Sequence, residues 1–375
     1  GVHSGGTPDC HPSRVPAGRT ASGSAPVPPS PLPSVPPAGI RPRCELGDCV
    51  CRQSVSVLAE VDRRVARVGS SRLRTLPTMK PARPVQTGDL VANTYRLEYV
   101  LGQGRSGIVF AASERRGSEL VAIKILLREL AQHPDAIESF RGSARAAAAV
   151  RCDEVCRVLE LAETESGIPC VVMEYLEGCD LSRAAAARAP YVYSEAASYM
   201  LQACAGLAAA LQFGVVHADL KPSKLFAVAG SGERRVKLLD LGGSVDTPLP
   251  PMAAGQSQLP GCNAALWLCD AEYAAPEQLD ARGLVDARTN VWAVGAILYR
   301  LVCGRPPFHE PTPQRLMAAV RAGEPASPRA LDIEVPEGFT RVLERALAKS
   351  RSDRFESVRE LATALAPYAS EYARA

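Results

Sequence analysis

The stretch VHADLKPSK, residues 216–224, decides the fold when it is taken together with LLDLG at residues 238–242. Each stretch carries one aspartate, Asp219 and Asp240, and twenty-one positions separate the two. A third motif, APE at residues 275–277, lies further along the chain. Each motif is short enough to arise by chance, so the information lies in their order along one chain.

A glycine-rich stretch stands upstream, GQGRSGIV at residues 102–109, with the spacing G-x-G-x-x-G-x-V. Alone this motif is weak, and in a dinucleotide-binding domain a helix would follow it directly. Here a strand pattern follows, and the next strand pattern carries VAIK at residues 121–124. Glycine lets backbone amides approach phosphates closely, and the ammonium of Lys124 can reach the same phosphates. The alternative, a plain hairpin with an exposed lysine, fits the paired motifs poorly.

Composition sets the outer limits of the interpretation. The chain has 375 residues, of which 46% are hydrophobic and 22% charged, so it can bury a sizeable core in one or two domains. A net charge of +3 is too even to indicate a nucleic-acid partner. No run of 18 apolar residues and no signal-peptide pattern occur, so we expect a cytoplasmic protein without a membrane span.

The first 84 residues differ from the rest. Residues 1–42 hold eleven prolines, and residues 41–84 carry a net charge of +6, so we predict a disordered Pro/Arg-rich N-terminal region. One helix at residues 57–68 is the alternative within it. The first methionine is Met79, which leaves open whether residues 1–78 are expressed or lie upstream of the true start.

The twelve cysteines do not predict a metal site. Cys44 and Cys49 have the spacing of one ligand pair, and Cys152 and Cys156 have that of another half-site. A structural zinc site needs two such pairs at matching spacing, which neither region supplies. We therefore expect reduced cysteines that behave as small apolar residues.

From about residue 94 the hydrophobic pattern changes to regular structure, with strands before helices. Such segregation predicts an α+β fold, with a small β-rich lobe ahead of a larger helical lobe. Strand patterns cover residues 95–101, 108–112, 120–127, 155–161 and 170–175, and helical patterns cover residues 134–150, 194–213, 289–303, 312–322, 337–348 and 356–366.

Together the ordered motifs resemble the bacterial, eukaryotic-like Ser/Thr protein kinases, over about residues 94–368. The resemblance implies the two-lobed protein-kinase fold and transfer of the γ-phosphate of ATP to protein Ser/Thr hydroxyls, with Mg²⁺ and an unknown protein substrate or regulatory partner. It also implies a structural ion pair between Glu277 and Arg354. A small-molecule kinase of the same fold is disfavoured, since LKP at residues 220–222 and APE resemble protein kinases specifically.

The resemblance implies roles for single positions. Lys124 would pair with the α- and β-phosphates, and Met173 would precede a hinge whose backbone reads the adenine edge. Asp219 would accept the proton of the substrate hydroxyl, Lys221 would touch the γ-phosphate, and Asp240 would hold Mg²⁺. The implied ATP-binding residues are Gly102, Gly104, Gly107, Val109, Ala122, Lys124, Glu174, Leu176 and Phe226.

Five positions depart from the family pattern: Ser143 for the Glu of the N-lobe helix, Ala218 for Arg, Lys224 for the metal-binding Asn, Asp270 for Thr and Asn290 for Asp. Ser143 cannot orient Lys124 with a charge. Lys224 has no lone pair to offer a metal, so we predict that it displaces the second Mg²⁺ and holds phosphate instead. A further hypothesis pairs Asp270 with Lys221 or Lys224 in the place of substrate.

Two functional hypotheses follow. The retained lysines and aspartates favour an ATP-dependent Ser/Thr protein kinase, and the departures favour a pseudokinase that acts as a nucleotide-binding or regulatory module. Because Ala218 replaces the arginine that would pair with a phosphate, activation-loop phosphorylation should not switch this protein.

Overall fold

The computed structural model describes residues 84–374, apart from residues 116, 118, 231–234, 242, 245–270 and 280–284. These residues belong to one compact unit, residues 42–375. The predictions for the tail before residue 84, for Cys44 and Cys49 and for Asp270 lie outside them. No helix in the described part of the chain is long and apolar enough to cross a membrane.

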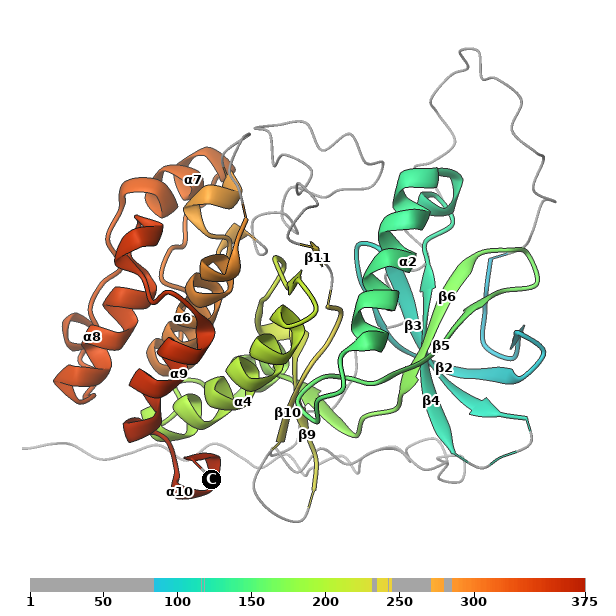
Figure 1. Cartoon of the computed structure of the whole chain (residues 1–375), viewed down its shortest axis with the longest axis horizontal. Helices are drawn as coiled ribbons and strands as arrows, with labels where there is room; N and C mark the ends of the chain where they lie inside the picture. Colours follow the sequence, from blue (N-terminus) through green and yellow to red (C-terminus); the bar gives the residue numbers. More distant parts are fainter. Residues whose placement is uncertain are drawn as a thin grey trace, which may run out of the picture. The chain divides into compact units, whose positions relative to one another are not determined.

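The N-terminal part is a six-stranded antiparallel sheet in the order β1-β2-β3-β4-β6-β5 (Figure 1). Its core includes Leu97, Phe110, Ile123 and Val172, which are all almost fully buried. The strands are β1 (Leu90–Val91), β2 (Tyr95–Gln103), β3 (Gly107–Glu114), β4 (Leu120–Leu126), β5 (Val158–Glu163) and β6 (Pro169–Glu174).

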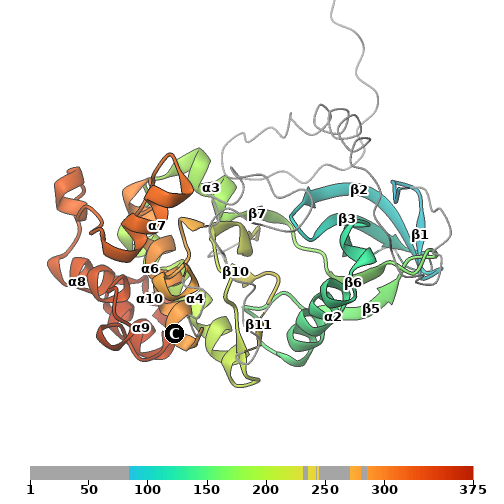
Figure 2. The same ribbon diagram turned by 90° about the horizontal axis from the view of Figure 1, so that it is seen from above.

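One helix, α2 (Pro134–Ala149), packs against β5 and β6 of this sheet, as Figures 1 and 2 show. Proline at its first position suits the helix start, because the missing N–H would have no partner there. Its last turns are rich in alanine, and Ala144 and Ala147 are buried. The sheet thus carries Lys124 on β4, and α2 lies on the side of β5 and β6.

The C-terminal part is helical and is built around α4 (Tyr193–Leu211) and α6 (Ala287–Cys303). Nearly every residue of α6 is buried, which its apolar sequence on all sides predicts. Asp286 caps its start by accepting a hydrogen bond from the Arg288 N–H, and Gly304 ends it at φ 70°. The other helices of this part are α3 (Leu181–Arg188), α7 (Pro313–Ala322), α8 (Glu337–Ala346), α9 (Val358–Leu365) and α10 (Glu371–Arg374).

Short strands between β6 and α6 position the two motifs that decide the fold. A three-stranded sheet has the order β10-β9-β7, and β8 pairs with β11. In the β9–β10 hairpin Leu225 lies opposite Leu238, so the residue before Leu225 and the residues after Leu238 lie side by side. These strands are β7 (Gly178–Asp180), β8 (Val215–Val216), β9 (Leu225–Val228), β10 (Arg235–Leu238) and β11 (Gly243–Ser244).

The predicted α+β fold with a β-rich lobe and a helical lobe is confirmed. The strand predicted over residues 155–161 is wrong at its start, because β5 begins at Val158. Val155 instead forms an isolated parallel bridge with Leu238, outside the six-stranded sheet. The pattern also gave no sign of β7, β9 and β10, since strands of three or four residues are too short for a clear alternation.

Candidate active site

The β9–β10 hairpin brings Lys224 and Asp240 together. Lys224 directly precedes β9 and Asp240 follows β10 by two residues. The backbone N–H of Leu239 donates to the carbonyl oxygen of Lys224 at 2.8 Å, which continues the ladder past the end of both strands. The register of this hairpin therefore sets which side chain faces Asp240.

Asp240 contacts two ammonium groups, one from each part of the fold. Its Oδ1 lies 2.8 Å from the Nζ of Lys124 on β4, and its Oδ2 lies 2.5 Å from the Nζ of Lys224. Burial alone raises the pKa of Asp240, but the two ammonium groups outweigh burial and hold the pKa well below its usual range. Asp240 is thus an anion between two cations.

Helix α2 approaches Lys124 with an aromatic ring in place of a carboxylate. The Nζ of Lys124 lies 5.9 Å from the centre of the Phe140 ring, a cation–π contact. Ser143, at the position of the family glutamate, lies one turn further along the same helix. Glu138 pairs with Arg145 on the exposed face of α2. The ion pair of Lys124 is therefore with Asp240, and Phe140 of α2 adds the cation–π contact.

The second aspartate has its own pair of cations. The Oδ1 of Asp219 lies 3.5 Å from the Nζ of Lys221 and 3.5 Å from a guanidinium nitrogen of Arg105. Asp219 is 44% exposed, as an acceptor for an incoming group must be. Arg105 comes from the glycine-rich loop. Sequence reasoning did not single out Arg105, although a cation between Gly104 and Gly107 was the available signal.

The glycine-rich stretch forms the turn between β2 and β3. The N–H of Gly104 donates to the carbonyl oxygen of Gly107 at 2.8 Å, which closes the turn. A Cβ at Gly107 would lie 2.5 Å from the carbonyl oxygen of Ile125, so this position requires glycine. Gly102 pairs with Val109, and Val109 in turn pairs with Lys124 on β4. The turn and Lys124 are therefore neighbours in one sheet.

The segment predicted to be the adenine hinge begins at the end of β6. Ala122 on β4 lies opposite Met173 on β6, and Glu174 ends that strand. The Glu174 carboxylate accepts hydrogen bonds from the Arg157 N–H and from the Nζ of Lys237, both at 2.7 Å. These contacts hold the Glu174 side chain, and its backbone N–H donates to the carbonyl oxygen of Arg157 at 3.0 Å, so the predicted contact of Glu174 with adenine stays a prediction. Leu176 follows β6 and Phe226 lies on β9; their predicted contacts with adenine stay predictions.

The APE motif, together with Gln278 directly after it, connects the segment around Asp219 to the C-lobe. Glu277 and Arg354 form the predicted ion pair, which the structure confirms at 2.8 Å between Oε1 and NH1. Gln278 donates a hydrogen bond to the carbonyl oxygen of Ala218 at 2.6 Å, and Ala218 has a left-handed backbone at φ 56°. Asn290, which replaces the family aspartate, has a buried Oδ1 with no hydrogen-bond partner among the described residues.

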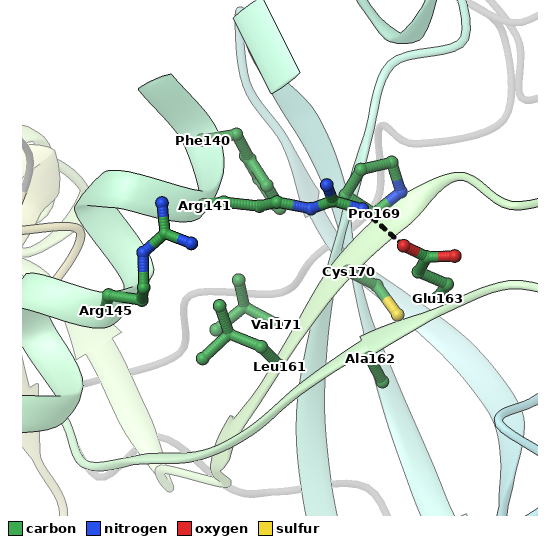
Figure 3. Close-up of a pocket in the computed structure, with 9 residues that line it drawn as sticks. All are labelled: Phe140, Arg141, Arg145, Leu161, Ala162, Glu163, Pro169, Cys170 and Val171. Atoms are coloured by element: carbon green, nitrogen blue, oxygen red, sulfur yellow. Dashed lines mark hydrogen bonds and ion pairs between the residues drawn. The ribbon is translucent and has the colours of Figure 1, made fainter. Parts of the chain in front are cut away.

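A pocket of about 460 Å³ lies between α2, β5 and β6 (Figure 3). Arg141 reaches from α2 to Glu163 on β5 across it, and Phe140 and Val171 line it on the side of Lys124. None of the residues predicted for ATP or catalysis lines this pocket. We therefore define the candidate active site by the contacts of Asp219 and Asp240 with their lysines, and not by this pocket.

The residues present do not fit a pair of Mg²⁺ ions. Asp240 is the predicted metal ligand, and each of its oxygens already contacts an ammonium. Lys224, at the position of the second ligand, offers only hydrogen-bond donors. No three His, Cys, Asp or Glu side chains gather in metal-binding arrangement within the described residues. A two-metal site therefore lacks its ligands among the residues that the structure describes.

Comparison with known proteins assigns the class. The family model of the protein kinase domain matches residues 95–364, so the chain belongs to the protein kinase family. Its relatives include the serine/threonine-protein kinase Pkn1 of Myxococcus xanthus, 30% identical over 82% of this chain and 42% of that protein. The serine/threonine-protein kinase PknB of Mycobacterium tuberculosis is 30% identical over 72% of this chain and 42% of that protein.

The solved structures agree with the fold. The PknI kinase domain of Mycobacterium tuberculosis superposes with a TM-score of 0.56 at 24% identity, covering 76% of this chain and 99% of that domain. The match therefore includes a complete kinase domain. The chain spans about two fifths of the length of the curated relatives that it matches.

Proposed function

We propose that this chain binds ATP and transfers its γ-phosphate to a Ser or Thr hydroxyl of a protein substrate. The observation that carries the proposal is the 2.8 Å contact between Lys124 on β4 and Asp240 after β10. This contact joins the two lobes at the position where the family binds phosphate, Lys124, and at the position where it binds Mg²⁺, Asp240. Protein kinases use ATP and Mg²⁺, and a bound Mg²⁺ would neutralise phosphate charge.

Each retained side chain has a part in the proposed reaction. The turn at Gly104 and Gly107 covers the phosphates with backbone amides, and Lys124 holds the α- and β-phosphates. Asp219 accepts the proton of the attacking hydroxyl. Lys221, 3.5 Å from Asp219, places positive charge beside the transferred group. Catalysis of this kind rests on positioning and charge neutralisation rather than on covalent chemistry.

The second candidate function is nucleotide binding without transfer, in a regulatory module. Two observations favour it. Lys224 lies on Asp240 where a metal ion would be needed, and Ser143 leaves α2 without the carboxylate that would orient Lys124. Both candidates bind ATP, so they differ in turnover alone.

Radiolabelled ATP with a generic protein substrate tests the proposal, in Mg²⁺ and separately in Mn²⁺. We expect label on the substrate with the full chain, and loss to background with Asp219→Asn. Asp353→Asn, on an exposed turn of the C-lobe, removes an equal charge and should leave transfer unchanged.

A thermal melt completes the test. Millimolar ATP should raise the melting temperature of the wild type by mass action. A thermal shift without any transfer would leave the regulatory module as the function. A folded sample with no shift would remove both candidates.

A further inference from the structure

The two aspartates and the four cations that contact them form one feature, which we call the cation cluster. It has two groups: Lys124 and Lys224 contact Asp240, and Lys221 and Arg105 contact Asp219. Each carboxylate therefore contacts two cations. The members of the cation cluster are Arg105, Lys124, Asp219, Lys221, Lys224 and Asp240.

The position of Lys224 is fixed by the backbone. The Leu239 N–H bonds to the Lys224 carbonyl at 2.8 Å, and the following residue is Asp240. The Lys224 side chain is 19% exposed and that of Asp240 is 28% exposed, so solvent screens this contact only in part. The ammonium of Lys224 is therefore a counter-ion of the Asp240 carboxylate, supplied by the protein itself.

A metal ion at Asp240 would meet an electrostatic obstacle. A metal ion on either carboxylate oxygen competes with an ammonium for the lone pairs of Asp240, and it lies close to two like charges. Ser143 adds no carboxylate that could draw Lys124 away. The arrangement opposes a divalent cation and leaves positive charge for an anion.

We propose that this site binds ATP without a metal ion, with Lys224 and Lys124 taking the place of Mg²⁺ on the polyphosphate. The inference rests on the proposed function, since it concerns the same nucleotide site. Metal-free ATP keeps the full negative charge of its polyphosphate, and the ammonium groups of Lys124 and Lys224 supply positive charge there in place of Mg²⁺. Lysine binds phosphate as a point charge, so its flexible ammonium can turn from Asp240 to the ligand.

Calorimetric titration of the full chain with a non-hydrolysable ATP analogue tests the inference. One titration contains excess EDTA and the other saturating Mg²⁺. We expect binding in EDTA at least as tight as in Mg²⁺. Because the readout is binding, the result does not depend on whether the chain transfers phosphate.

Lys224→Asn is the matching variant, and it should lose about tenfold in affinity for the metal-free analogue, equivalent to about 1.4 kcal/mol. It should also bind more tightly in Mg²⁺ than in EDTA. Arg235→Gln is the control, because it removes one positive charge from an exposed site at the other end of β10. It should behave as the wild type does.

Each outcome of the titrations either supports or overturns the inference of metal-free binding. Binding only in Mg²⁺ overturns the inference and leaves the proposed function standing, whereas absence of binding in both solutions overturns the two together. Equal affinity of wild type and Lys224→Asn in EDTA also overturns it. The two wild-type titrations decide even where the variant fails to fold, which a thermal melt reveals.

Discussion

Two ion-pair sites in this chain use the same chemistry in opposite ways. In the C-lobe, Glu277 receives two parallel hydrogen bonds from Arg354, at 2.8 and 2.9 Å, and a third from Thr289 at 2.8 Å. One anion meets one cation there, and both are buried. At Asp240 one anion meets two cations, and each side chain is partly exposed.

This difference suggests a structural role for the Glu277 site and a ligand-binding role for the Asp240 site. Arg354 also donates to the carbonyl oxygens of Ala348 and Lys349, so its donors are satisfied by the protein. Such a neutral, closed pair needs nothing from outside. In the cation cluster each carboxylate contacts two cations, and the side chains are partly exposed, so an anionic ligand can reach them. Breaking the first site should therefore cost stability, and breaking the second should cost binding.

The largest effect is expected from Arg354→Met. It leaves the Glu277 carboxylate buried without its cation, which costs roughly 3–5 kcal/mol. Urea unfolding measures the loss. Arg351→Met breaks the Arg351–Asp286 pair, which is 36% and 41% exposed, and should cost below about 1 kcal/mol. Equal losses in the two variants would show that burial does not set the contribution of the Glu277–Arg354 pair to stability.

Acid should act on the same buried pair. Burial raises the pKa of Glu277, but the hydrogen bonds and charge of Arg354 outweigh it and lower that pKa below its usual range. A carboxyl with a lowered folded pKa stabilises the fold above its unfolded pKa of about 4.3, and this stability is lost as pH falls through the folded value. Glu277→Gln should therefore lose less stability than wild type between about pH 7 and about pH 3. An unchanged slope of stability against pH would contradict this assignment.

Much of the candidate site could be predicted from sequence because its residues sit in ordered motifs. Alternation located the central strands β2, β3, β4 and β6, and hence the strand that carries Lys124. Three-residue and four-residue strands leave no such pattern, so the β9–β10 register was not predicted. That register is what places Lys224 on Asp240 rather than elsewhere near phosphate.

Contacts between distant segments were the other limit. Nothing in a linear pattern pairs Glu174 with Lys237 or brings Arg105 to Asp219, since each pair joins segments more than sixty residues apart. The Glu277–Arg354 pair was predicted through the family resemblance alone. Its full hydrogen bonding, with Thr289 as a third donor, needed the structure.

Lys224→Met tests the same comparison at the Asp240 site. Removing one of two cations from Asp240 still leaves Lys124 in place, so stability should change by no more than about 1 kcal/mol. Urea unfolding against Arg354→Met measures this difference. A loss as large as that of Arg354→Met would mean that Lys224 is a structural element, and the distinction between the two sites would fail.

The smallest effect is expected from restoring the family residues to the Asp240 site. Ser143→Glu adds a carboxylate on α2 that competes with Asp240 for Lys124, and Lys224→Asn frees an oxygen of Asp240 and adds a carbonyl ligand for metal. The two changes remove one positive charge and add one negative charge at the site, and both shifts favour a divalent ion. They act on the same phosphates, so the double variant should transfer label faster than the two single effects combined predict. Each single change should alter the rate only severalfold, or about 1 kcal/mol.

Initial rates at saturating ATP, measured against increasing free Mg²⁺, give the answer, with Ser143→Gln as a control of equal size and no charge. Transfer by the double variant should come to depend on Mg²⁺ beyond the amount that saturates ATP, because a second ion then has ligands. A double variant that binds ATP and still transfers no phosphate to protein would show that the missing residues are not what limits turnover. The nucleotide-binding module without transfer would then be the function of this chain.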